Sequence, residues 1–79
     1  MTARVLFFGS IREAVGESEM ILPIDAGTDA AQAFTTIFER FPAMSRHKLL
    51  FAINQQYATG SETINDGDEI AIFTPVSGG

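Results

Sequence analysis

The 79-residue chain has no cysteine, no tryptophan, one histidine and only five basic side chains. Without cysteine there can be no disulfide, thiolate metal site or cysteine nucleophile, and this fits a reducing cytoplasm. The ten acidic side chains give a net charge of −5, which argues against binding along nucleic acid. No apolar run approaches the roughly 20 residues of a membrane span, and we expect no signal peptide.

The hydrophobic residues, 46% of the chain and including seven Phe, are enough for one core. This length and composition predict a single domain over residues 1–75. Residues 76–79, which include Ser77, Gly78 and Gly79, have little side chain to bury and predict a flexible C-terminal tail.

Alternating or continuous apolar residues predict the strands. Residues 3–9 predict the first strand, and its run over residues 5–8 is apolar on both faces, which is typical of a central strand. Residues 18–24 predict an antiparallel return strand, and Pro23 favours an edge position. Residues 49–54 predict a third strand, followed by a turn and a short fourth strand that begins near Tyr57. Residues 68–73 predict the last strand, because Pro75 cannot donate to a sheet.

A main helix is predicted over residues 30–40, with Thr28 or Asp29 as its N-cap and Pro42 after its end. Its apolar residues recur every three or four positions and must face a sheet. A short helix is predicted over residues 11–15, capped by Ser10, and residues 44–48 are predicted to form a loop.

This order of elements is typical of an α+β, β-grasp (ubiquitin-like) fold. We expect a mixed sheet of four to five strands, with the first and last strands parallel at its centre. The main helix lies across the sheet, and the short helix follows the first strand.

Several polar groups could suggest other chemistry, but their spacing does not support it. His47 lies in a charged loop with no partner placed by spacing, and we interpret it as a surface residue. Asp66, Asp68 and Glu69 lack the spacing of a calcium loop and predict a turn. We therefore expect no bound cofactor and no metal site.

The chain ends in Gly78-Gly79, directly after a predicted buried strand. Four extended residues after Pro75 reach about 13–14 Å. Glycine has no Cβ, so the walls of a narrow site could approach the terminal backbone closely. The dipeptide alone fits a frayed end equally well.

Two stretches of the sequence favour a functional C-terminus over a frayed end. Residues 66–79, DGDEIAIFTPVSGG, and residues 5–16, VLFFGSIREAVG, resemble the small subunit of molybdopterin synthase, a family of ubiquitin-like sulfur carriers. The resemblance implies that an E1-like enzyme uses ATP to adenylate Gly79, and that a sulfur donor protein then supplies the sulfur of a thiocarboxylate. It also implies a heteromeric sulfurtransferase whose large subunit binds the substrate, cyclic pyranopterin monophosphate, in molybdenum cofactor biosynthesis. This chain would not be catalytic alone.

The resemblance also implies site residues. Gly79 would carry the sulfur, and Gly78 would allow passage through a narrow channel. Pro75 and Val76 would direct the tail, and together with Ser77 they would contact a partner. Phe73 has the opposite parity to Ile70 and Ile72, so it should face away from the helix. With Phe8 and Tyr57 it could form an exposed apolar patch that binds the large subunit and the E1-like enzyme.

Three alternatives remain open. A thiamine-pathway sulfur carrier has the same fold and tail but normally lacks the helical insertion over residues 10–16. A protein modifier would form isopeptide bonds through Gly79. A plain β-grasp interaction module would have inert terminal glycines.

Overall fold

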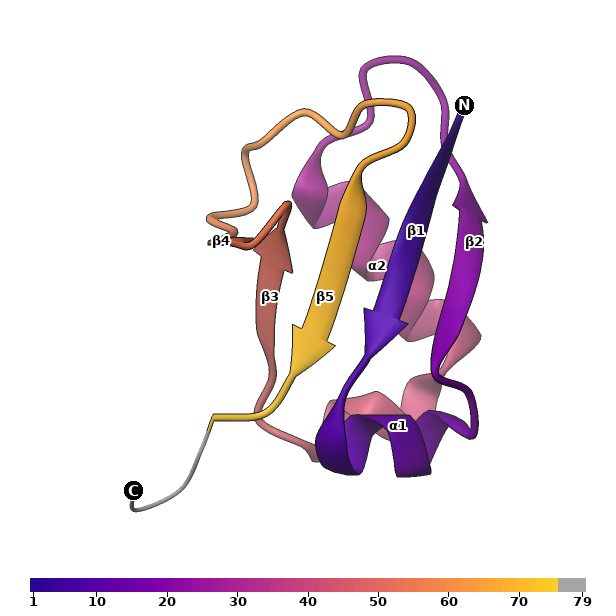
Figure 1. Cartoon of the computed structure of the whole chain (residues 1–79), viewed down its shortest axis with the longest axis vertical. Coiled ribbons are helices and arrows are strands. Elements are labelled where there is room, and N and C mark those ends of the chain that lie inside the picture. Colours follow the sequence, from indigo (N-terminus) through magenta and orange to yellow (C-terminus); the bar gives the residue numbers. More distant parts are fainter. Residues whose placement is uncertain (76–79) are drawn as a thin grey trace.

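The computed structural model describes residues 1–75 and has a five-stranded mixed sheet with one long helix across one face (Figure 1). The strand order is β2-β1-β5-β3-β4. The predicted α+β, β-grasp fold is confirmed. In chain order the elements are β1 (Thr2–Phe7), α1 (Gly9–Val15), β2 (Glu19–Pro23), α2 (Ala30–Arg40), the 3₁₀ helix η1 (Pro42–Arg46), β3 (Leu50–Ile53), β4 (Gln56–Tyr57) and β5 (Glu69–Phe73).

The first and last strands lie at the centre of the sheet and run parallel, as predicted. Val5 is opposite Ile70 and Phe7 is opposite Ile72 in this pairing, and all four side chains are buried. β2 is an antiparallel edge strand that ends at Pro23, where a missing N–H costs no ladder bond. The other edge is β4, which is only two residues long.

The long helix α2 lies behind the sheet in Figure 1 and covers one of its faces. Asp29 is its N-cap: the carboxylate accepts a hydrogen bond from the N–H of Gln32 at 2.8 Å, and the Gln32 side chain accepts one from the N–H of Asp29. This reciprocal pair satisfies two of the donors that a helix start leaves free. Further along α2, the ring of Phe34 stacks on that of Phe51 in β3, with ring centroids 3.8 Å apart.

Two local predictions were wrong. Residues 44–48 are not simply a loop, because Pro42–Arg46 form η1 and Met44 is completely buried in the core. Ser10 is not the cap of α1 but lies inside it, because the helix begins at Gly9, two residues before the predicted start. The N-cap is the extended Phe8, which makes no side-chain cap. Gly9 has a φ of +57°, so glycine allows the abrupt change from strand to helix there.

Candidate functional site

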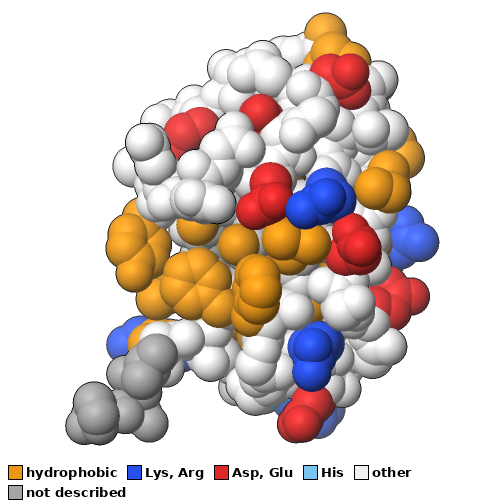
Figure 2. Space-filling view, viewed as in Figure 1, with side chains coloured by type: hydrophobic (Ala, Val, Ile, Leu, Met, Phe, Trp, Pro, Cys, Tyr) orange, Lys and Arg blue, Asp and Glu red, His pale blue; other side chains and the backbone are white. Residues whose placement is uncertain are grey.

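The face of the sheet opposite α2 has no element over it in residues 1–75, and it divides into an apolar and a charged part. Figure 2 shows hydrophobic side chains gathered in one continuous area over the lower halves of β1, β5 and β3. Charged side chains lie directly above this area in the same view. The apolar area is at the end of β5 where the described chain stops.

We define the apolar patch as the hydrophobic residues that line a shallow recess of about 330 Å³ on this face. They come from four elements or their ends and are Phe8, Ala52, Tyr57, Ala71 and Phe73. Phe8 is 48% exposed and Tyr57 is 73% exposed. The rings of Tyr57 and Phe73 have centroids 6.1 Å apart and are tilted by 41°. An exposed cluster of this kind is typical of a surface that binds another protein.

The structure thus brings together the three aromatic residues singled out in the sequence. The parity argument for Phe73 holds, since Ile70 and Ile72 are fully buried while Phe73 is half-buried on the other face. Phe8 follows β1, and its N–H donates to the carbonyl of Ile72 at 3.1 Å, which fixes it beside β5. Whether these residues bind a partner stays a prediction.

The sequence reading missed three residues of the recess. Ala52 and Ala71 lie opposite each other on β3 and β5, and both line the recess. Gln55, in the turn after β3, is the polar residue of the lining. Alanine carries no distinctive sequence signal, so only the strand register reveals its position.

A second recess of about 290 Å³ lies between the start of α1 and the end of β5. It is lined by Phe8, Gly9, Phe73, Thr74 and Pro75, and so it is continuous with the apolar patch through the two phenylalanines. Pro75, predicted to direct the tail, therefore lies beside the patch. Val76, Ser77, Gly78 and Gly79, the other predicted tail residues, lie outside the described residues.

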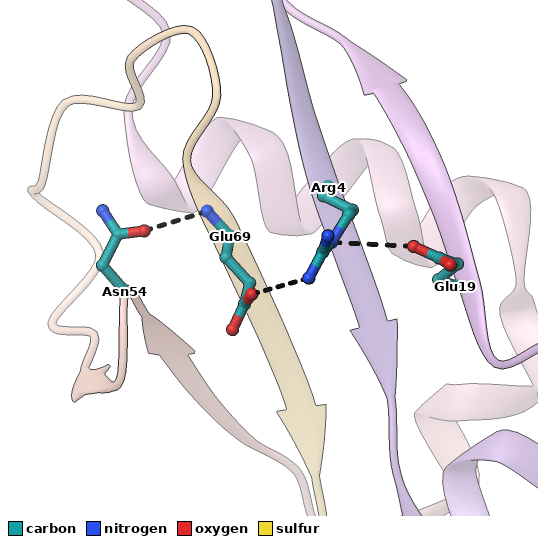
Figure 3. Close-up of polar contacts among 4 residues, drawn as sticks. All are labelled: Arg4, Glu19, Asn54 and Glu69. Atoms are coloured by element: carbon teal, nitrogen blue, oxygen red, sulfur yellow. Dashed lines mark hydrogen bonds and ion pairs between the residues drawn. The ribbon is translucent and has the colours of Figure 1, made fainter.

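The charged part of the open face is a row across three strands (Figure 3). Arg4 on β1 lies between two carboxylates: its Nη2 is 2.9 Å from Oε2 of Glu69 on β5, and its Nε is 3.6 Å from Oε2 of Glu19 on β2. Asn54 accepts a hydrogen bond from the N–H of Glu69 at 3.0 Å through Oδ1. This row borders the apolar patch on the side away from Pro75.

One carboxylate near the β4 edge is tied into a loop. Glu62 accepts hydrogen bonds from the backbone N–H groups of Thr59 at 2.7 Å and Gly60 at 2.9 Å. The bond from Thr59 is the main reason why the pKa of Glu62 lies below its ordinary value of 4.5. The backbone carbonyl of Glu62 accepts a hydrogen bond from the N–H of Ala30 at 2.7 Å, so the loop that the carboxylate ties together is joined to the start of α2. The role of Glu62 is structural.

Other candidate chemistry has little support in the structure. Among residues 1–75 no group of three or more histidine or acidic side chains is arranged to hold a metal ion. His47 lines a different groove, with Phe38, Leu49 and Phe51. Asp66 and Asp68 accept hydrogen bonds from the N–H groups of Thr2 and Asn65 in the turn before β5. None of the helices in this part of the chain is long and apolar enough to cross a bilayer.

Known proteins with similar sequences identify the family of this chain. A family model described as the ThiS family matches residues 5–79. The molybdopterin synthase sulfur carrier subunit of Escherichia coli (strain K12) is 38% identical over 79 residues, covering 96% of this chain and 98% of the relative.

Two solved structures extend the comparison to the fold. SAMP1 from Haloferax volcanii superposes with a TM-score of 0.88 at 25% identity, with both chains fully covered. A complex of subunits 1 and 2 of the molybdopterin-converting factor from Helicobacter pylori 26695 contains a chain that superposes with a TM-score of 0.70 at 24% identity, again over both whole chains. The predicted resemblance is confirmed. The chain therefore belongs to the ThiS family, in the group of molybdopterin synthase sulfur carrier subunits.

Proposed function

We propose that this chain is the sulfur-carrying small subunit of molybdopterin synthase, a heteromeric sulfurtransferase. The observation that carries the proposal is the match over the whole length, at 34% identity, to the molybdopterin synthase sulfur carrier subunit of Chlamydomonas reinhardtii. The ThiS family model also extends to Gly79. The β-grasp body with an apolar patch beside its C-terminal exit supports it. The chain acts in the cytoplasm and binds no cofactor of its own.

The chemistry follows from the terminal carboxylate of Gly79, which is a poor electrophile. An E1-like enzyme joins it to the AMP part of ATP and releases pyrophosphate, and this supplies a good leaving group. A donor protein then supplies sulfur at the sulfide level, which forms a C–S bond at the carbonyl carbon as the C–O bond to AMP breaks, and the product is a thiocarboxylate. Its sulfur is nucleophilic, unlike the original carboxylate oxygen, and is transferred to cyclic pyranopterin monophosphate.

The substrate pocket belongs to the large subunit in this proposal. Residues 1–75 offer shallow surface recesses and no cluster of basic side chains on the open face, where Arg4 is already paired with two carboxylates. The apolar patch is the surface that contacts the large subunit and, at another stage, the E1-like enzyme. The complex of the two Helicobacter pylori subunits supports such an assembly.

The intact mass of the protein tests the central step. After incubation with ATP, a sulfur source and the E1-like enzyme of the same organism, we expect the mass increase that corresponds to replacing one oxygen by sulfur. Deletion of Gly79 should abolish it, while Glu39→Gln on the exposed surface of α2 should not. An unchanged mass, with an enzyme that loads another carrier of this family, would contradict the proposal.

A second function, protein modification through Gly79, is favoured by one observation. The superposed SAMP1 is named a small archaeal modifier protein. In that case the terminal carboxyl would form an isopeptide bond with a lysine of another protein. Covalent conjugates that disappear on deletion of Gly79 would support this function, and their absence from cells that make molybdopterin would exclude it.

A further inference from the structure

The two-residue turn between β3 and β4 has an unusual backbone for its sequence. Both of its residues have positive φ, 49° at Asn54 and 70° at Gln55. Tight hairpin turns of this kind match the twist of the strands, and the preferred sequence is Asn-Gly. A side chain at positive φ is crowded by its own backbone, so Gln55 occupies a position that favours glycine.

The positive φ of Asn54 is explained by contacts that stabilise the fold. Its Oδ1 accepts a hydrogen bond from the N–H of Glu69 at 3.0 Å (Figure 3). Its Nδ2 donates to Oδ1 of Asp68, also at 3.0 Å, so the Asn54 side chain ties the turn to the start of β5. Asparagine is also among the residues that adopt this conformation most readily. The left-handed backbone at Asn54 therefore has a structural purpose.

No such contact explains the positive φ of Gln55. Its side chain is exposed, and within residues 1–75 its carboxamide has no hydrogen-bond partner. It lines the same recess as Phe8, Tyr57 and Phe73, where the other lining residues are apolar. A strained backbone at a residue that lines a candidate binding surface indicates a role outside the isolated domain.

We propose that Gln55 is a specificity-determining residue of the apolar patch, and that its carboxamide hydrogen-bonds a backbone peptide group of the large subunit. This inference rests on the proposed function. A primary carboxamide both donates and accepts, so it can pair with the N–H and C=O of an extended segment that crosses the patch. Apolar neighbours exclude water around such a bond, and a partner that leaves the buried carboxamide unpaired is penalised.

The variant Gln55→Gly separates binding from folding, because it relieves the backbone and removes the carboxamide. We expect its Tm to rise by about 4 °C, the shift typical of a small stabilisation in a domain of this size. Its affinity for the large subunit should fall roughly fivefold, in the range of one lost hydrogen bond. Gln56→Ala is the matched control, since Gln56 is exposed on β4 but does not line the recess.

The affinities are measured by titrating each variant with the purified large subunit of the same organism. Weaker binding by Gln55→Gly together with unchanged binding by Gln56→Ala supports the inference. Binding by Gln55→Gly equal to that of the wild-type chain, or equal losses in both variants, overturns it. A fall in the Tm of Gln55→Gly overturns the claim of strain. If the wild-type chain itself does not bind, the proposed partner and this inference both fail.

Discussion

The two faces of the sheet are built from alternating residues of the same strands, but they differ sharply in exposure. On the face under α2, Val5, Ile70 and Ile72 are fully buried. On the open face, Phe8 is 48% exposed and Tyr57 is 73% exposed. The covered face therefore gains the free energy of removing apolar surface from water, about 25 cal/mol per Å², and the open face gains only part of it.

This difference indicates which residues hold the fold and which are available to a partner. Large aromatic side chains left in water add little to folding stability and favour association. On the open face, Phe8 and Phe73 line a recess with Pro75, and the Glu19–Arg4–Glu69 row lies on the other side of the apolar patch. Substitutions on the two faces should therefore affect different measurements.

The largest effect on stability is expected on the covered face. Ile72→Ala removes a fully buried side chain that lies between β1 and β3, and we expect a loss of about 2–5 kcal/mol in the free energy of unfolding. For a domain of this size the total is about 4–12 kcal/mol, so the variant should be close to unfolding. Urea titration followed by circular dichroism measures the change.

A graded control accompanies this variant. Ile72→Val removes one methylene and should cost about 0.5–1.5 kcal/mol. Losses below about 0.5 kcal/mol in both variants would mean that the covered face is loosely packed, contrary to its burial.

The next effect is expected in binding. Phe73→Ala, on the open face one residue further along β5, should weaken binding to the large subunit by at least about tenfold, as for an aromatic side chain at the centre of an interface. Its loss of stability should be smaller than that of Ile72→Ala, because Phe73 is only half-buried. Calorimetric titration gives the affinity.

Ile21→Ala is the matched control for Phe73→Ala. Ile21 is also apolar, is 57% exposed and lies on β2 opposite Arg4, beyond the apolar patch. It should leave the affinity unchanged. Equal losses in the two variants would mean that the whole open face contributes to binding, and no loss in either would remove the patch from the interface.

The sequence predicted the covered face well because its signals are local. The apolar spacing of α2, the Asp29 cap and the alternation of Ile70 and Ile72 each depend on residues within a few positions of one another. Parity within β5 also placed Phe73 on the open face. Met44 was missed, because its burial depends on how η1 packs against the rest of the chain.

The open face was predicted only in outline, because its residues come together through contacts between strands that are distant in the sequence. Ala52 and Ala71 meet through the register of β3 and β5, which pairs residues 19 positions apart, and the sequence contains no local sign of it. A turn was predicted after the third strand, but the positive φ of Gln55 was not, because glutamine departs from the Asn-Gly pattern by which such turns are recognised. The composition of the open face therefore depends on the pairing of distant strands, which local sequence patterns do not predict.

The smallest effect is expected in the charged row. Arg4→Gln breaks two exposed ion pairs and should lower the free energy of unfolding by less than about 1 kcal/mol, because water and salt screen such pairs. Urea titration at low and high salt measures it, and the difference from wild type should shrink as salt is added. A double-mutant cycle with Glu69→Gln isolates the shorter of the two pairs. A loss of about 2 kcal/mol or more would mean that the row holds β2, β1 and β5 together, and the open face would then belong to the folding unit as much as the covered face does.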